Sequence, residues 1–252
     1  MRILLRPCQL LYVFYAIALF VILMLPVFLW ALIAFLFGRI KGGNLVYYGC
    51  VVWADVWFLL IFIRHKNIYR GEKENYRSYI FVANHISYLD SAILPKTFRH
   101  PVRPLGKVEM TKIPLFGTIY EKAIVTVDRS SAGHRAKSVK ILKSLLQKKI
   151  SILVFPEGTF NTTGKPLKHF YDGAFRIAIE TGTPIKPVLF LNTFNRMHYH
   201  SVFSLNPGKS RSVFLPEIPV EGLTIHDVQT LKRQVYEEME KVLIEYKASW
   251  IK

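Results

Sequence analysis

The chain has 252 residues, 51% of them apolar, and a formal net charge of +17. This length allows one α/β domain with an appendage, and the apolar fraction is higher than a soluble enzyme usually needs. The excess of basic residues favours anionic partners, but neither zinc-finger spacing nor a basic coiled coil is present, so we expect no nucleic-acid partner.

Two apolar segments lie at the N-terminal end. The first runs from Cys8 to Phe37 without a charged residue, and the second runs from Leu45 to Ile63 with Asp55 as its one charge. We interpret both as membrane segments. A signal peptide is the alternative for the first segment, but the apolar part is about twice the usual ~7 to 15 residues and no convincing cleavage site follows it.

The two segments are predicted to form a membrane anchor over residues 1–66. Thirty helical residues measure about 45 Å, whereas the hydrocarbon core is about 30 Å thick, so one upright span fits poorly. Pro26 is expected to break or kink the first segment, and Gly38, Gly42 and Gly43 supply a turn. We favour a helical hairpin that dips into one leaflet, with two full spans as the alternative.

The remainder, residues 67–252, is predicted to be the α/β domain. Residues 1–64 hold five of the 34 basic and one of the 17 acidic residues, which leaves +13 on the rest of the chain. Next to a membrane anchor, such a charge favours anionic lipid. Cys8 and Cys50 form no metal, redox or disulfide pattern, so we expect the domain on the cytoplasmic side of the inner membrane.

Beyond residue 66, short β-rich runs alternate with helical patterns, which predicts a mostly parallel sheet flanked by helices. A polar hairpin around Asn206 to Gly208 is expected to add an antiparallel edge. The predicted strands are Tyr79 to Ala83, Ile124 to Val127, Ile150 to Phe155 and Ile185 to Leu191, and the predicted helices are Ser138 to Leu146, Gly173 to Glu180 and Val228 to Tyr246.

Asn84 and His85 follow the first of these strands, and Asp90 lies five residues after the histidine. Ligands of parallel sheets collect at the carboxyl ends of strands. One straight helix would hold His85 and Asp90 about 140° apart, so we expect the histidine in the loop and the aspartate at the start of the next helix. The carboxylate can then fix the imidazole tautomer and leave one nitrogen free to accept a proton.

A histidine base of this kind needs a nucleophile. Ser87 and Ser91 are candidates for a hydrolase-like triad, but the chain has no G-x-S-x-G elbow, so the nucleophile can belong to the substrate. A capping or core histidine is the alternative reading of His85 taken alone.

Further stretches at predicted strand ends support a phosphate and acyl site. Glu157, Gly158 and Thr159 follow one strand, where the glycine permits close backbone approach and the glutamate can hold a substrate hydroxyl or a basic partner. Gly117 is expected in a turn, and Arg129 follows another strand, where a guanidinium suits a bidentate grip on phosphate. The stretch Pro184 to Val188 is interpreted as structural.

In chain order these motifs are Asn84-His85 with Asp90, Phe116-Gly117 with Asp128-Arg129, Phe155 to Thr159, and Pro184 to Pro187. The set resembles the four motifs of the 1-acylglycerol-3-phosphate acyltransferase family over residues 78 to 191. The apolar N-terminal segments resemble the membrane anchor of that family.

The resemblance implies a mechanism. His85, oriented by Asp90, deprotonates the glycerol hydroxyl of lysophosphatidic acid, which attacks the thioester of acyl-CoA or acyl carrier protein and gives phosphatidic acid. Neither a cofactor nor a metal is expected. Arg129 would bind the acceptor phosphate. Glu157, Gly158 and Thr159 would seat the glycerol, Asn84 would steady the loop or polarise the carbonyl, and Gly117 would let the chain turn near the ligand.

Two departures from the family pattern leave room for another lysolipid, such as a lyso-aminolipid. Phe160 stands where the family often has arginine or another polar residue, and Asp172 stands beside Gly173 where a basic residue is common. Both remove positive charge from the expected headgroup pocket. Basic residues that can compensate are Lys165, Lys168 and Arg176.

Two other functions remain open at this stage, a lipid hydrolase in which water replaces the acceptor and a non-catalytic lipid-binding protein. The intact His85 and Asp90 pair argues against the second. His198 and His200 would share a face if they lay on a strand, but no third metal ligand accompanies them, so we interpret them as surface or packing residues.

Overall fold

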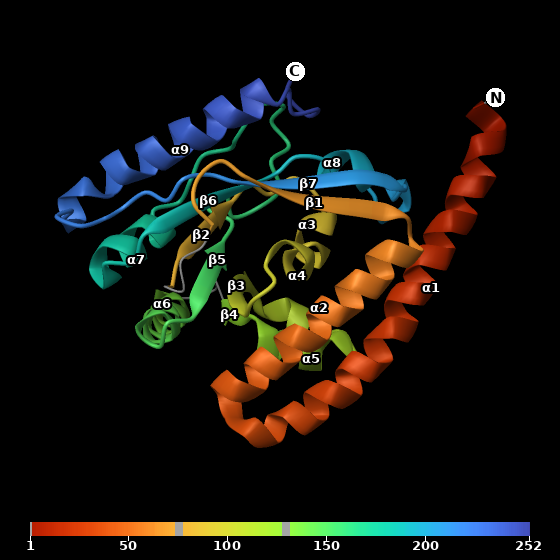
Figure 1. Ribbon diagram of the computed structural model, residues 1–252, viewed down its shortest axis with the longest axis horizontal. Helices are drawn as coiled ribbons and strands as arrows, with labels where there is room; N and C mark the ends of the chain where they lie inside the picture. Colours follow the sequence, from red (N-terminus) through yellow and green to blue (C-terminus); the bar gives the residue numbers. More distant parts are fainter. Residues whose placement is uncertain (1, 74–77, 128–131) are drawn as a thin grey trace.

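The computed structural model describes residues 2–73, 78–127 and 132–252. Within these ranges, seven strands form a sheet in the order β1-β7-β6-β2-β5-β3-β4 (Figure 1). The predicted α/β class is confirmed, and each of the four predicted strands is present. The strands are β1 (Ile63–Tyr69), β2 (Ile80–Ala83), β3 (Val102–Lys107), β4 (Val125–Val127), β5 (Ser151–Val154), β6 (Ile185–Phe190) and β7 (Gly208–Phe214).

Strand direction divides the sheet into two parts. From β6 to β4 all neighbours are parallel, whereas β7 runs antiparallel to β6 and β1 runs parallel to β7. The predicted antiparallel addition near Gly208 is therefore correct in direction, but β1 is the edge strand. The connection between β6 and β7 is longer than a hairpin turn at Asn206 to Gly208, because residues 191–207 include the short helix α8 (Thr193–Arg196).

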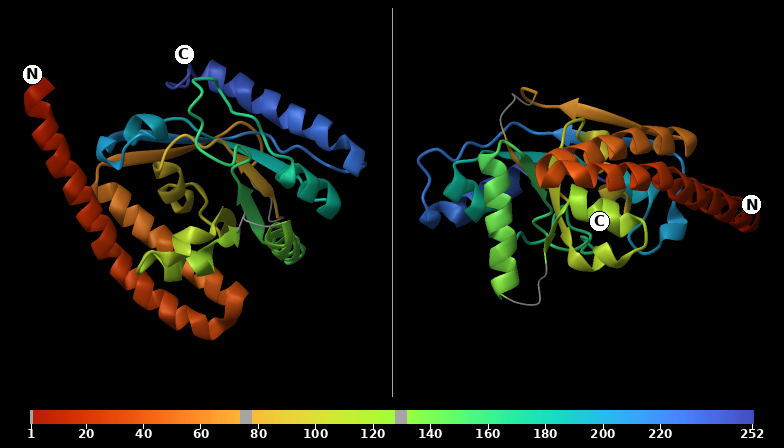
Figure 2. Two further views of the ribbon diagram at one scale, coloured as in Figure 1. Left: turned by 180° about the vertical axis from the view of Figure 1, so that it is seen from behind. Right: turned by 90° about the horizontal axis from the view of Figure 1, so that it is seen from below.

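Helices cover both faces of the sheet (Figures 1 and 2). Alternation along β2 explains the layers: Phe81 and Ala83 pack with α1 and α2, whereas Ile80 and Val82 pack with α6, α7 and α9. The helices are α1 (Arg2–Ala34), α2 (Gly43–Leu60), α3 (Leu89–Ala92), α4 (Leu94–Thr97), α5 (Phe116–Ala123), α6 (Ala132–Gln147), α7 (Gly173–Thr181) and α9 (Val228–Glu245).

Helices α1 and α2 form an antiparallel hairpin whose turn spans residues 35–42. Gly38 has a φ of 70° in this turn, as expected for a glycine, but Pro26 lies inside α1 and does not end it. The Trp57 indole donates to the Ala16 carbonyl at 2.9 Å and the Tyr12 hydroxyl donates to the Ile61 carbonyl at 2.7 Å. The helical stretch Pro7–Leu60 is long and apolar enough to cross a membrane.

The hairpin shares a hydrophobic core with the sheet. Trp53, Trp57 and Phe58 from α2 belong to the same buried cluster as Phe81 and Phe98. The boundary expected at residue 66 falls within β1, which pairs with β7. The division into an anchor and an α/β domain stays a prediction.

Candidate active site

Two neighbouring parallel strands bring the central motifs together. β2 ends at Ala83, directly before Asn84 and His85, and β5 ends at Val154, shortly before Glu157. β2 pairs with β5 in parallel, so both loops leave the same edge of the sheet. This edge is the carboxyl end, where the sequence places the site.

His85 and Asp90 form the expected pair. The His85 Nδ1 and Asp90 Oδ2 atoms are 3.0 Å apart, with the histidine in the loop and the aspartate in the first turn of α3. The same oxygen accepts hydrogen bonds from the backbone amides of Ile86 at 2.6 Å and Ser87 at 2.8 Å. Because a carboxylate accepts only, His85 Nδ1 must carry the proton, and Nε2 is left as the acceptor.

The His85 ring is packed between aromatic side chains. It stacks on Phe155 with a centroid distance of 4.2 Å and meets Phe160 edge-on at 4.4 Å. Tyr88 contacts the other side of Phe160 at 4.9 Å. Phe160, which the sequence presents as a departure in the headgroup pocket, is thus a neighbour of the histidine base, a contact that no local sequence signal indicates.

Glu157 supports the histidine loop through its backbone. Its Oε1 accepts from the His85 amide and its Oε2 from the Lys168 amide, both at 2.8 Å. The side chain is 1% exposed, and burial raises the pKa of Glu157 to about 7. The predicted contact between Glu157 and the acceptor glycerol stays a prediction.

The two residues after Glu157 keep the loop close to the site. Gly158 has a φ of 71°, a left-handed conformation that disfavours other residues. Thr159 is exposed, and its hydroxyl accepts a hydrogen bond from Lys168 Nζ at 2.7 Å. The predicted roles of Gly158 and Thr159 in seating the glycerol stay predictions.

Asn84 joins β2 to β6. Its amide nitrogen donates to the Phe190 carbonyl at 3.1 Å, and its oxygen accepts from the Phe190 amide at 2.8 Å. The side chain is 1% exposed. Of the two roles expected for Asn84, this geometry supports the steadying of the loop.

Gly117 lies in the first turn of α5 and not in an open turn. A Cβ atom at this position would lie 2.0 Å from the Thr111 carbonyl oxygen, so glycine is needed for close packing of the backbone. Arg129 and its neighbour Asp128 lie outside the described residues. The predicted roles of Gly117 and Arg129 in ligand binding stay predictions.

The two serines considered as nucleophiles, Ser87 and Ser91, are not arranged for that role. Ser87 is fully buried, its hydroxyl donates to the Met197 carbonyl, and it accepts from the Leu89 amide at 3.0 Å. Ser91 is exposed on α3. The Ser87 hydroxyl is already engaged in these two hydrogen bonds, which argues against a hydrolase triad built on Ser87.

The charge of Asp172, the acidic residue that departs from the family pattern, is neutralised by a lysine on another helix. Asp172 accepts from Lys232 Nζ at 2.7 Å and from Gln229 at 3.0 Å, both on α9, which lowers the pKa of Asp172. Lys165 and Arg176 are exposed. The negative charge of Asp172 is therefore paired and need not repel an acceptor phosphate.

His198 and His200 lie in the loop after α8, so the strand on which they would share a face is absent at these described residues. Their rings stack with a centroid distance of 4.7 Å. Among the described residues, no group of three or more His, Cys, Asp or Glu side chains is arranged to hold a metal ion.

A buried carboxylate that orients a histidine at the ends of parallel strands is the apparatus of a general-base enzyme. Comparison with known proteins indicates which reaction such an enzyme catalyses. A family model described as acyltransferase matches residues 63–191. The 1-acyl-sn-glycerol-3-phosphate acyltransferase of Salmonella typhimurium is 30% identical over 69% of this chain and 71% of its own length. The protein of that name from Escherichia coli is 29% identical over 69% and 70%.

A solved structure agrees in fold. The 1-acyl-sn-glycerophosphate (LPA) acyltransferase PlsC from Thermotoga maritima is 23% identical and superimposes with a TM-score of 0.75 over all of both chains. The chain belongs to the acyltransferase family, as the resemblance of its motifs indicates. The protein is therefore an enzyme, and the alternative of a non-catalytic lipid-binding protein is rejected.

Proposed function

We propose that this enzyme transfers a fatty acyl group from acyl-CoA or acyl carrier protein to the free hydroxyl of lysophosphatidic acid, forming phosphatidic acid. The observation that carries the proposal is the 3.0 Å contact between His85 Nδ1 and Asp90 Oδ2, in a chain whose relatives bear that activity in their names.

The reaction follows from the free Nε2 atom of His85. Nε2 accepts the proton of the glycerol hydroxyl while the hydroxyl oxygen attacks the thioester carbonyl. The tetrahedral intermediate then expels the thiolate, which takes that proton from His85 Nε2 as the ester forms, and the histidine is again free to act as a base. The substrate supplies the nucleophile, so the proposal requires neither a cofactor nor a metal.

Membrane attachment fits a lipid acceptor. Many apolar side chains of the hairpin are exposed, including Leu11 at 70% and Leu36 at 84%. We propose that α1 and α2 lie in one leaflet of the inner membrane and that the catalytic part faces the cytoplasm. A lysolipid can then enter from the bilayer while a soluble donor arrives from water.

The first experiment is acyl transfer from radiolabelled palmitoyl-CoA and palmitoyl carrier protein to a panel of lysolipids, with wild type and His85→Ala. Product on lysophosphatidic acid that is lost in the variant supports the proposal. Product mainly on a lyso-aminolipid would keep the mechanism and replace the acceptor. Release of fatty acid without any lysolipid would instead identify a hydrolase.

A further inference from the structure

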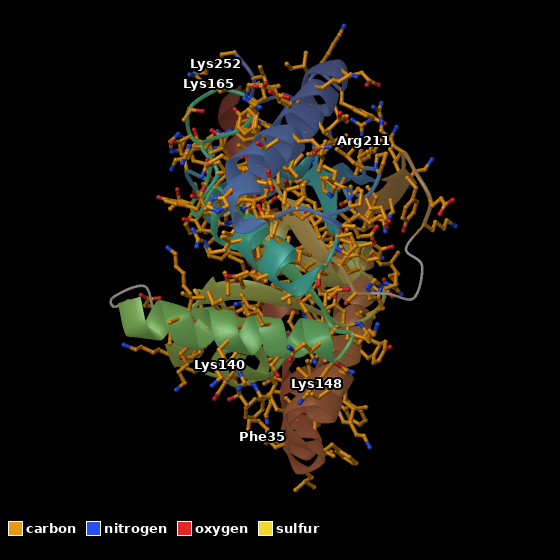
Figure 3. All side chains as sticks on the ribbon, turned by 90° about the vertical axis from the view of Figure 1, so that its left-hand side faces the viewer. Phe35, Lys140, Lys148, Lys165, Arg211 and Lys252 are labelled. Carbon is orange, nitrogen blue, oxygen red and sulfur yellow. The ribbon has the colours of Figure 1, made fainter. Side chains whose placement is uncertain are left out.

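The hairpin turn and α6 enclose a groove away from the catalytic loops. The groove has a volume of about 750 Å³, and one wall is formed by the turn around Arg39 to Lys41. The other wall is the outward face of α6 (Figure 3), with Lys140 and Lys148 beside the hairpin. None of the catalytic-motif residues within the described ranges lines it.

Among the residues that the structure describes, five cations and no carboxylate line this groove. Lys137 and Lys140 lie one turn apart on α6, Lys148 follows the end of that helix, and all three line the groove with Arg39 and Lys41 of the hairpin turn. All five are exposed, and none of their side chains forms a hydrogen bond or ion pair with another described residue. By contrast, Lys143 on the same helix is paired with Glu180 at 2.7 Å.

A sixth cation lies behind the turn. Arg103 on β3 is 3% exposed, and its Nη2 atom donates to Asn44 Oδ1 at 2.5 Å and to the Ile40 carbonyl at 3.4 Å. Its Nη1 atom is buried without a partner in the described structure. Cations that share one groove repel one another, and an anion bound there would relieve that repulsion.

The floor of the groove is apolar. Phe37 and Ile40 contribute from the turn, and Ile141 and Leu145 contribute from α6. Phe37 continues into Leu36, which is 84% exposed on the membrane hairpin. A free phosphate would make no favourable contact with these apolar side chains. A phospholipid presents an anionic headgroup and apolar chains together, so it matches both parts of the groove.

We propose that this groove binds an anionic phospholipid of the membrane on which the enzyme rests. The phosphate lies between the cations of the turn and those of α6, and the acyl chains follow Phe37 onto the apolar surface of the hairpin. The site places the hairpin turn at the level of the lipid headgroups, and Arg39 and Lys41 need not enter the hydrocarbon core.

The test is co-sedimentation of the full-length protein with vesicles of phosphatidylcholine alone or mixed with phosphatidylglycerol. The groove variant is Lys137→Gln, Lys140→Gln and Lys148→Gln. The matched control is Lys209→Gln, Lys241→Gln and Lys252→Gln, which removes the same charge from exposed lysines outside the groove. Thermal melting checks that both fold.

We expect the groove variant to lose about tenfold or more of its affinity for the anionic vesicles, and the control to lose much less. Binding to neutral vesicles should be equal for all three proteins because the apolar hairpin is unchanged. Equal losses in the groove and control variants would mean a diffuse basic surface and would overturn the site.

A second pair of measurements tests the geometry and the occupant. Arg39→Gln with Lys41→Gln should reproduce the loss, since these residues form the opposite wall. A normal affinity would overturn a two-walled site. In detergent micelles the groove variant should keep its KM for palmitoyl-CoA and palmitoyl carrier protein. A tenfold rise in either KM would reassign the groove to the acyl donor.

Discussion

The Oε1 atom of Glu157 accepts a hydrogen bond from the backbone amide of His85 at 2.8 Å. This bond joins the loop after β5 to the loop after β2, at the residue that carries the base. The backbone position of His85 is therefore set by one carboxylate, and the ring orientation is set by another, that of Asp90.

His85→Ala should lower kcat for acyl transfer by about 10² to 10⁴-fold, because it removes the imidazole that takes the acceptor proton. Ser91→Ala is the control, since Ser91 lies one residue from Asp90 and is exposed. It should keep nearly full activity, as measured by product formation on lysophosphatidic acid. Loss of activity in Ser91→Ala together with His85→Ala would point to an enzyme nucleophile.

Glu157 should make stability depend on pH. Burial raises its pKa from 4.5 to about 7, so between these values the folded protein binds more protons than the unfolded chain. The contribution of Glu157 to stability is thus present below about pH 4.5, is lost as pH rises to about 7, and is constant above that value.

The measurement is the free energy of unfolding of wild type and Glu157→Gln at several pH values. The stability difference between them should move against the wild type by about 1 to 3 kcal/mol from the acidic to the neutral end. A difference that does not change with pH would contradict the raised pKa.

Phe160→Ala should lower kcat by about tenfold and leave KM nearly unchanged. The reason is that the edge-on contact at 4.4 Å restricts the His85 ring, and aromatic contacts of this kind are worth about 0.5 to 1.5 kcal/mol. Phe160→Tyr keeps the ring and should retain activity. A change confined to KM for the lysolipid would place Phe160 in the headgroup pocket instead.

Gly117→Ala should destabilise the fold by about 1 to 3 kcal/mol, because the added Cβ meets a backbone oxygen at 2.0 Å. Gly173→Ala is the matched control. A Cβ there meets nothing within 4 Å, so that variant should be neutral or more stable. Thermal melting of both variants tests the contrast, and equal melting temperatures would contradict it.

Sequence reasoning performed well where the signal is local. The runs that became β2, β5 and β6 are mostly apolar, with Ser151 and Lys186 as the polar residues, as expected for strands buried on both faces. β1 and β3 were not predicted, because β1 is largely polar and β3 contains Pro104 and Gly106, which weaken a strand pattern.

At the active site, too, features that depend on local spacing were predictable and features that depend on distant partners were not. The fold-back of Asp90 onto His85 follows from their spacing of five residues, and the structure contains it. The role of Glu157 could not be read from sequence, since its partners are backbone amides that any residue offers. The pairing of Asp172 with Lys232 spans 60 residues and depends on how α9 packs.

The shared core of the hairpin and the sheet bears on how this enzyme can be handled. A chain shortened to begin at β1 would leave Phe81 and Phe98 uncovered and would take Asn44 away from the buried guanidinium of Arg103. Such a truncation should yield an insoluble protein. A water-soluble form is better sought by replacing outward-facing side chains such as Leu11 and Leu36 with polar ones, with both helices left in place.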